Sequence, residues 1–251
     1  MKMLYLVPLF LAGLFVVHVL KMLRFYLVLL EQKIELKKFM FLYLKTTFLN
    51  LLIPFKLGEI YRIYCVIKLT DCTQVGILSV VLDRFFDTFI LLLFLLPYDL
   101  LVLRGLTWIT GTLLIFLLLV MLAYRMFEPT YLYLNEYLIR SSRSKRGIWI
   151  LSFMEMLREW YDYTKDLIKG RQYLIIFCSA LGWIGEAGLL FMISGYYQIG
   201  FGVEESAAYI QSIFSAEKSL IFTAYNRISM YILFALILLF LCIRLLRRKK
   251  Q

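Results

Sequence analysis

The sequence predicts an all-α fold: a polytopic integral membrane helix bundle that contains two opposed re-entrant helical hairpins. The first observation is composition, since 62% of the 251 residues are hydrophobic and only 18% are charged, against about 25% charged residues in soluble domains. A soluble domain of this length could not bury so much apolar surface in one core. The excess is expected to face lipid, which excludes a soluble enzyme, a disordered chain and a secreted disulfide scaffold.

The second observation is the set of long apolar runs. A helix that crosses a membrane needs about 20 mostly apolar residues. Each such run is expected to be helical, because backbone exposed to lipid must satisfy its own hydrogen bonds. The first run is expected to remain as a span, because no small-residue cleavage site follows it. The runs are predicted to form one transmembrane domain over residues 1–251, with spans at 3–20, 74–96, 104–124, 172–195 and 228–246.

The third observation is that residues 36–70 and 196–226 are too apolar for ordinary loops and too interrupted by Gly, Pro and charges for spans. Irregular backbone at membrane depth is tolerated only inside protein or beside a wet cavity. A re-entrant helix–break–helix hairpin suits both stretches, and paired opposed hairpins can build a transport site. Amphipathic segments lying on the membrane surface are the alternative. Residues 128–170 mix Trp and Tyr with charges, which predicts cytoplasmic interfacial helices.

The charge distribution predicts orientation. The net charge of +11 favours cytoplasmic loops beside anionic lipid over a nucleic-acid partner. The basic clusters at 21–38, 140–146 and 244–250 all lie in the cytoplasm if the N-terminus is outside and the C-terminus is cytoplasmic. This predicts a multi-pass protein of the cytoplasmic membrane. The four cysteines are scattered and there is one histidine, so neither a metal site nor a cofactor is predicted.

A first candidate motif spans residues 50–62 and contains Asn50, Pro54, Gly58, Glu59 and Arg62. Pro54 bends the chain and Gly58 permits a close backbone approach. Glu59 and Arg62 are three residues apart, so they share a helix face and can pair. An arginine held by a carboxylate near the membrane suits a phosphate ligand. From the residues alone, an ordinary interfacial ion pair is an equal alternative.

A second candidate motif, Asp83-Arg84-Phe-Phe-Asp87, lies inside an otherwise apolar span. An ionisable residue at the centre of a membrane helix costs about 2.5–3.5 kcal/mol on insertion scales, and such residues usually mark transport pathways. We therefore favour a transport role over the alternative, a structural ion network between helices. Glu186, in the span 172–195, is expected to face the same cavity or to pair with an arginine.

A third candidate motif comprises Gly200, Gly202 and Glu205, and Arg227 follows at the head of the last span. Glycines leave backbone amides free to bind an anion or allow helices to touch. Taken alone, this stretch is better explained as a flexible external loop.

Together, the motifs resemble the membrane domain of the lysylphosphatidylglycerol synthase/flippase family over about residues 5–246. The segment from Pro54 to Arg62 is the most specific match. The chain departs from the family where Tyr197 to Ile199 replace a Pro-Gly-Gly run. An initial span of longer members and the soluble aminoacyl-transfer domain are also not found in this sequence, so lysyl transfer is not expected. The matching residues are Asn50, Pro54, Gly58, Glu59, Arg62, Asp83, Arg84, Asp87, Gly200, Gly202, Glu205, Arg227 and Tyr231.

The resemblance implies a flippase of an anionic lipid, a phospholipid or a sugar-carrying isoprenoid phosphate, in cell-envelope or glycolipid assembly. Such a protein is not an enzyme and has no catalytic residues. Its partners would be membrane lipids, with a glycosyltransferase or a second copy of the chain also compatible. The alternative is a membrane glycosyltransferase, or its accessory scaffold subunit, that uses a lipid-phosphate sugar donor. The implied roles are phosphate binding for Arg62, Arg84 and Arg227, and arginine holding or proton transfer for Glu59, Asp87 and Glu205.

Overall fold

A computed structural model describes residues 2–53, 57–141, 145–214 and 218–248, and the regular secondary structure of these residues is all helical. The predicted all-α fold class is therefore confirmed. A short 3₁₀ turn (Leu30–Gln32) and a π-helical turn (Asp99–Leu103) join some of the α-helices. The described α-helices are α1 (Lys2–Val28), α2 (Leu36–Leu52), α3 (Leu57–Thr70), α4 (Thr73–Tyr98), α5 (Trp108–Ser141), α6 (Lys145–Ile168), α7 (Gln172–Tyr196), α8 (Val203–Phe214) and α9 (Leu220–Arg248).

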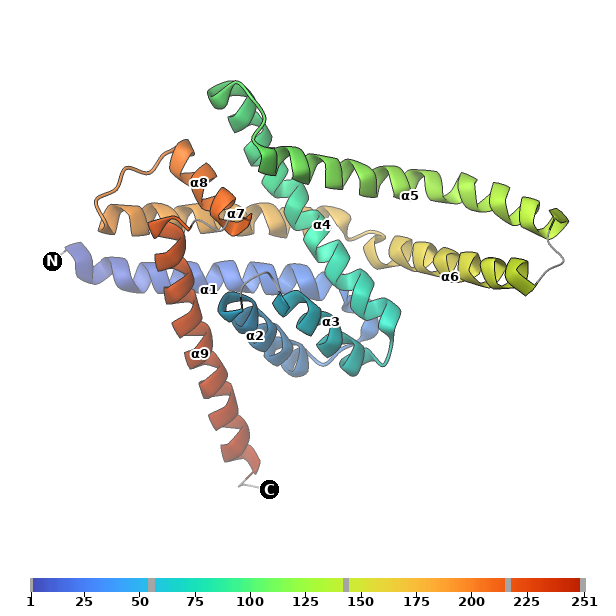
Figure 1. The fold of residues 1–251 in the computed structure, drawn as a ribbon. Helices are drawn as coiled ribbons and strands as arrows, with labels where there is room; N and C mark the ends of the chain where they lie inside the picture. The colour runs from blue at the N-terminus through green and yellow to red at the C-terminus, as the bar shows by residue number, and fades with distance from the viewer. Residues whose placement is uncertain (1, 54–56, 142–144, 215–217, 249–251) are drawn as a thin grey trace.

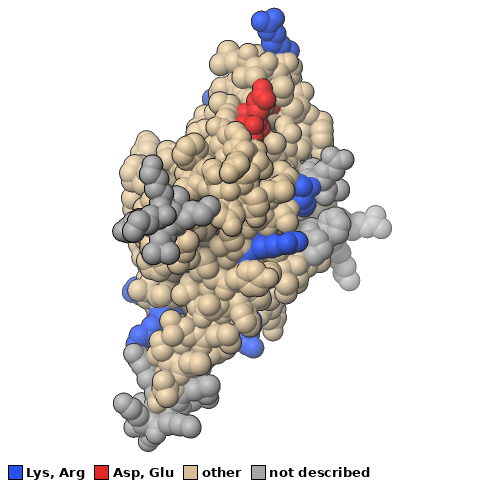
Figure 2. Space-filling model, turned by 90° about the vertical axis from the view of Figure 1, so that its left-hand side faces the viewer, with Lys and Arg blue, Asp and Glu red and all other residues tan. Residues whose placement is uncertain are grey.

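Five helices are long and apolar enough to cross a membrane: α1, α4, α5, α7 and α9. Each overlaps one of the five apolar runs of the sequence. Their lengths differ from the prediction mainly at one end, because α1 continues to Val28 and α5 continues to Ser141. The face of the molecule in Figure 2, which looks onto the left-hand side of Figure 1, displays few charged side chains.

The centre of the bundle is formed by α1 and α7, which lie side by side, with α4 crossing them (Figure 1). Small residues allow α1 and α7 to approach closely. A Cβ atom added at Gly13 would lie 2.9 Å from the Leu189 side chain, and one added at Gly185 would lie 2.9 Å from Val17. Small residues play this part at helix interfaces in membranes generally.

Helices α2 and α3 form a hairpin beside α4 (Figure 1). Phe39 at the start of α2, Val66 near the end of α3 and Val75 at the start of α4 share one apolar cluster. At 1.5 Å per residue the two helices are about 26 and 21 Å long, shorter than the ~30 Å apolar core of a bilayer. The hairpin thus begins and ends near the start of α4. Its re-entrant placement in a membrane stays a prediction, and Pro54 lies outside the described residues.

The second predicted hairpin, 196–226, differs in the structure. Residues 220–226 belong to α9, a continuous helix, so the expected break before the last span is absent. The helix begins at Leu220 because the Ser219 hydroxyl accepts a hydrogen bond from the amide of Phe222 at 3.2 Å, as N-cap residues do. Only α8 and its connections remain of the proposed hairpin, and its re-entrant character is not confirmed.

In the region 128–170, where cytoplasmic interfacial helices are predicted, the structure has the end of α5 and the whole of α6, and their placement at a membrane interface stays a prediction. Helix α5 continues through Pro129, and α5 and α6 form an antiparallel arm that extends away from the rest of the bundle (Figure 1). Contacts with α6 hold α5 on both sides of the proline. The ring of Phe127 lies 4.7 Å from that of Tyr161, and the Arg158 guanidinium lies 4.9 Å from the Tyr131 ring. These contacts offset the loss of the backbone hydrogen bond that Pro129 cannot donate.

Candidate functional site

Six charged side chains from three helices are joined in one network, which we call the charge cluster: Arg24 of α1, Glu59 and Arg62 of α3, and Asp83, Arg84 and Asp87 of α4. Asp83 lies at its centre and is 1% exposed. One carboxylate oxygen accepts from Arg24 Nε at 2.7 Å, and the other from Arg84 Nη2 at 2.8 Å. Arg62 Nη1 lies 3.3 Å from that second oxygen. The cluster therefore ties α1 and α3 to the central part of α4.

Arg24 is the member that sequence reasoning missed, because we counted it among the basic residues flanking a short first span. In the structure it lies within α1, 3% exposed. Its Nη1 donates to Asp87 at 2.5 Å and to the Ser179 hydroxyl of α7 at 3.2 Å. The available signal was the apolar run from Phe25 to Leu30, which shows that the hydrophobic segment does not end at Arg24.

The predicted pairing of Glu59 with Arg62 is present, with Arg62 Nη1 lying 3.3 Å from Glu59 Oε2. Glu59 also accepts a hydrogen bond from Asn50 Nδ2 at 2.5 Å across the hairpin. At Gly58 an added Cβ would lie 2.6 Å from the Asn50 Cα, so only glycine fits this approach of α3 to α2. Asn50, Gly58 and Arg62 thus set the position of the Glu59 carboxylate.

Arg84 is the most exposed arginine of the charge cluster. Its side chain is 33% exposed, whereas those of Arg24 and Arg62 are 3% and 4% exposed. Its outer contacts are long: Nε lies 3.6 Å from Glu59, and Nη1 lies 3.3 Å from Asp87. Arg84 Nε also has no hydrogen-bond acceptor among the described residues. A ligand that reaches the cluster would meet Arg84 first.

The charge cluster contains three guanidinium and three carboxylate groups, so its formal charge is zero. Burying an unpaired charge costs several kcal/mol, whereas a fully paired set can be accommodated. The balance explains how so many ionisable groups persist inside an apolar bundle. It also means that a bound anion competes with the three carboxylates for the arginines.

A second ionic contact lies beside the charge cluster. Lys21 of α1 pairs with Glu186 of α7, and Tyr209 of α8 donates a hydrogen bond to the other oxygen of Glu186 at 2.5 Å. Trp183 links the two sets, because its Nε1 donates to Asp87 at 3.0 Å and its ring lies 5.4 Å from Lys21 Nζ. Of our two expectations for Glu186, pairing is the one observed, but the partner is a lysine.

The residues of the third motif lie outside the charge cluster. Glu205 Oε2 accepts a hydrogen bond from the Gly202 amide at 2.7 Å, which is the contact by which an N3 glutamate caps its own helix. Arg227 is exposed on α9, and no ion pair joins it to other described residues. An added Cβ at Gly200 would meet open space. The arginines that the structure brings together are thus Arg24, Arg62 and Arg84, and Arg227 is not among them.

Comparison with known proteins identifies the family. A model of the lysylphosphatidylglycerol synthase transmembrane region matches residues 1–210. The chain belongs to this family. It is therefore a multi-pass membrane protein of a lipid-related family, and the match includes the whole charge cluster, whereas Arg227 and Tyr231 lie beyond it. Searches of curated proteins and of solved structures returned no match.

Proposed function

We propose that the protein is a flippase that carries the headgroup of an anionic lipid past the charge cluster. The observation that carries the proposal is the geometry of Arg84: it is a third exposed, held by long contacts, and backed by two buried arginines. Arginine binds phosphate through its planar fork of donors. The substrate class is a phospholipid or a sugar-carrying isoprenoid phosphate, in cell-envelope or glycolipid assembly.

Exchange of acceptors is the chemical step that transport requires. A phosphate oxygen can take the place of Glu59 or Asp87 on Arg84, since these contacts, at 3.6 and 3.3 Å, are the longest of its ion pairs. The displaced carboxylate then either turns to another arginine or takes up a proton. Arg24 and Arg62 supply the remaining positive charge from behind Asp83. Arg24 thus takes the third arginine position that sequence reasoning gave to Arg227.

The fold supports a path for the headgroup. Glu59, in the first turn of α3, lies beside Arg84 in the central part of α4. If α4 crosses the bilayer, the first turn of α3 lies within it, so we propose that the hairpin is re-entrant. We also propose an external N-terminus and a cytoplasmic C-terminus, as the Lys and Arg distribution predicts. Either a glycosyltransferase or a second copy of the chain is compatible as a partner.

The membrane glycosyltransferase is the less favoured alternative. A catalytic base for a lipid-phosphate sugar donor should be accessible at an interface. Glu59 is 13% exposed and Asp83 is 1% exposed, and both are paired with arginines. Paired charges in the interior favour a transport pathway.

A reconstitution experiment tests the proposal. Purified protein is placed in vesicles that contain a fluorescent phosphatidylglycerol or a fluorescent isoprenoid phosphate, and movement of the headgroup between leaflets is followed. Arg84→Lys keeps the charge but loses the fork, so we expect normal membrane insertion and a loss of about tenfold or more in rate, equivalent to ~1.4 kcal/mol.

The matched control is Arg140→Lys, because Arg140 is 79% exposed and its ion-pair partner among the described residues is Glu136 of its own helix. This variant is expected to transport at the wild-type rate. Full activity of Arg84→Lys would remove Arg84 from the site. Failure of the wild-type protein to move either lipid would contradict the proposed function.

A further inference from the structure

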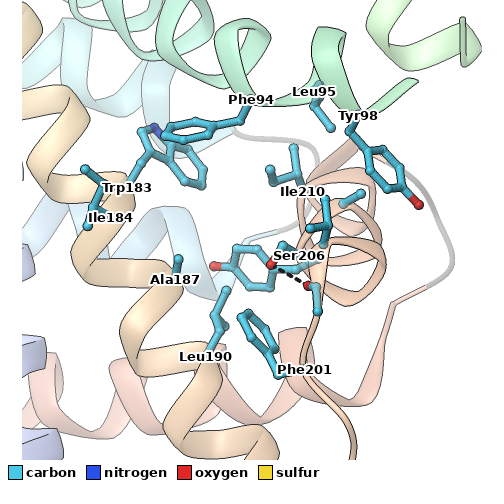
Figure 3. Close-up of a pocket in the computed structure, with 14 residues that line it drawn as sticks. Phe94, Leu95, Tyr98, Trp183, Ile184, Ala187, Leu190, Phe201, Ser206 and Ile210 are labelled. Carbon is cyan, nitrogen blue, oxygen red and sulfur yellow. Dashed lines mark hydrogen bonds between the residues drawn. The ribbon is translucent and has the colours of Figure 1, made fainter. Parts of the chain in front are cut away.

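A cavity of about 480 Å³ lies between α4, α7 and α8, next to the charge cluster but outside it. Figure 3 shows side chains from the three helices around the open space, with Phe94 on one side and Phe201 on the opposite side. Most of the lining is aliphatic or aromatic, including Leu95, Leu190 and Ile210. A cavity with so few polar groups does not hold ordered water well, so its natural occupant is apolar.

The mouth of the cavity is also apolar. Phe94 of α4, Ile184 of α7 and Val203 of α8 line it and are exposed. Helices α4 and α7 are candidate membrane spans, so their exposed apolar side chains are expected to face lipid. If α4 and α7 cross the bilayer, this exposed apolar rim lets a hydrocarbon chain enter the cavity sideways from the lipid.

Two side chains separate the cavity from the ionic groups. The rings of Trp183 and Tyr209 line the cavity. Their polar atoms point the other way, since Trp183 Nε1 donates to Asp87 and the Tyr209 hydroxyl donates to Glu186. The apolar cavity and the ionic groups are thus only one side chain apart. An amphiphile, which has an apolar chain next to a charged headgroup, could occupy both.

We propose that this cavity binds one hydrocarbon chain of the membrane lipid whose headgroup phosphate is bound by the charge cluster. The inference rests on the proposed function, because it assigns the place of the chain during headgroup binding. The volume of 480 Å³ corresponds to roughly sixteen groups of the ~30 Å³ that a water molecule occupies. A methylene group is of similar size, so the space suits a single hydrocarbon chain of ordinary length.

Fluorescence of Trp183 tests the site directly. A variant with Trp108→Phe, Trp149→Phe and Trp160→Phe keeps Trp183 alone, and its side chain is only 9% exposed. The variant is placed in nanodiscs of phosphatidylglycerol with or without bromine on the acyl chains, since bromine quenches indole on contact. We expect loss of most of the Trp183 fluorescence in the brominated lipid, because a chain in the cavity touches the ring.

Filling the cavity supplies the decisive comparison. Ala187 lines the cavity, whereas the adjacent Gly188 does not line it and has open space around an added Cβ. Adding Ala187→Phe to the Trp183-only protein should abolish quenching, and Gly188→Phe should leave it unchanged. Ser206→Leu fills the same space from α8 and replaces Ala187→Phe if that variant does not fold. Unquenched Trp183, or equal quenching in the filled and control variants, would overturn the proposal.

Parallel transport measurements keep the two proposals apart. If Ala187→Phe abolishes quenching but the protein moves no lipid, the cavity binds a hydrocarbon chain and the flippase function is rejected. If the protein transports lipid but Trp183 is never quenched, the flippase function holds and the binding of a hydrocarbon chain in the cavity is rejected. If both proposals hold, Ala187→Phe slows transport of long-chain phosphatidylglycerol more than that of a dihexanoyl analogue, whose chains do not need the cavity.

Discussion

The two motif-bearing ends of the molecule use similar residues in different ways. Around the α2–α3 hairpin, Glu59 and Arg62 reach other helices and join the charge cluster. At α8 and α9, Glu205 accepts a hydrogen bond from the amide of Gly202, the residue just before its own helix, and Arg227 is exposed. The comparison shows that a charged residue in a motif contributes to a shared site only where another helix brings it an opposite charge.

Removing an arginine is expected to produce the largest difference in stability between the two regions. Arg24→Met would leave Asp83 and Asp87 without their closest partner, and breaking a buried ion pair in this way costs about 3–5 kcal/mol. Arg227→Met removes an exposed charge and should change stability by no more than about 0.5 kcal/mol. Unfolding in detergent micelles with increasing SDS measures both. Equal losses would show that Arg227 also has a buried role.

Substituting one glycine in each region compares how tightly the backbone is packed there. The Cβ of Gly58→Ala would lie 2.5 Å from Asn50 Oδ1 and 2.6 Å from its Cα, and such overpacking costs about 1–3 kcal/mol. Gly200→Ala meets open space and should be neutral within ~0.5 kcal/mol. The same unfolding measurement compares them. A neutral Gly58→Ala would mean that α2 and α3 can separate without cost.

The smallest structural effect is expected at the cap of α8. Glu205→Ala removes the hydrogen bond to the Gly202 amide, and loss of a helix cap costs about 0.5–2 kcal/mol. Hydrogen exchange should become faster at the start of α8 and stay unchanged in α3. Faster exchange throughout the charge cluster would indicate that Glu205 supports an arginine after all.

The sequence predicts the helical spans well because a run of about 20 apolar residues has few other uses. It also predicts the pairing of Glu59 with Arg62, because residues three apart share a helix face. The close approach at Gly58 follows from the same local reasoning.

Contacts between distant residues could not be predicted in this way. Lys21 and Arg24 have the spacing and flanks of interfacial charges, and only the folded chain brings them Glu186 and Asp83. Nothing local distinguishes a lysine at a membrane surface from one paired with a carboxylate 165 residues later. Likewise, Trp183 and Ser179 gain their places beside the charge cluster only through the packing of α7.

The electrical neutrality of the charge cluster has a consequence for the energetics of transport. A phosphodiester headgroup carries one negative charge, so binding it leaves the neutral cluster with a charge of minus one unless a displaced carboxylate takes up a proton. Cargo and proton then cross together with no net charge. An uncompensated headgroup would instead gain or lose about 2.3 kcal/mol per 100 mV. A diffusion potential imposed on the vesicles should therefore leave the rate unchanged, and a rate that follows the voltage would show that the headgroup crosses without a proton.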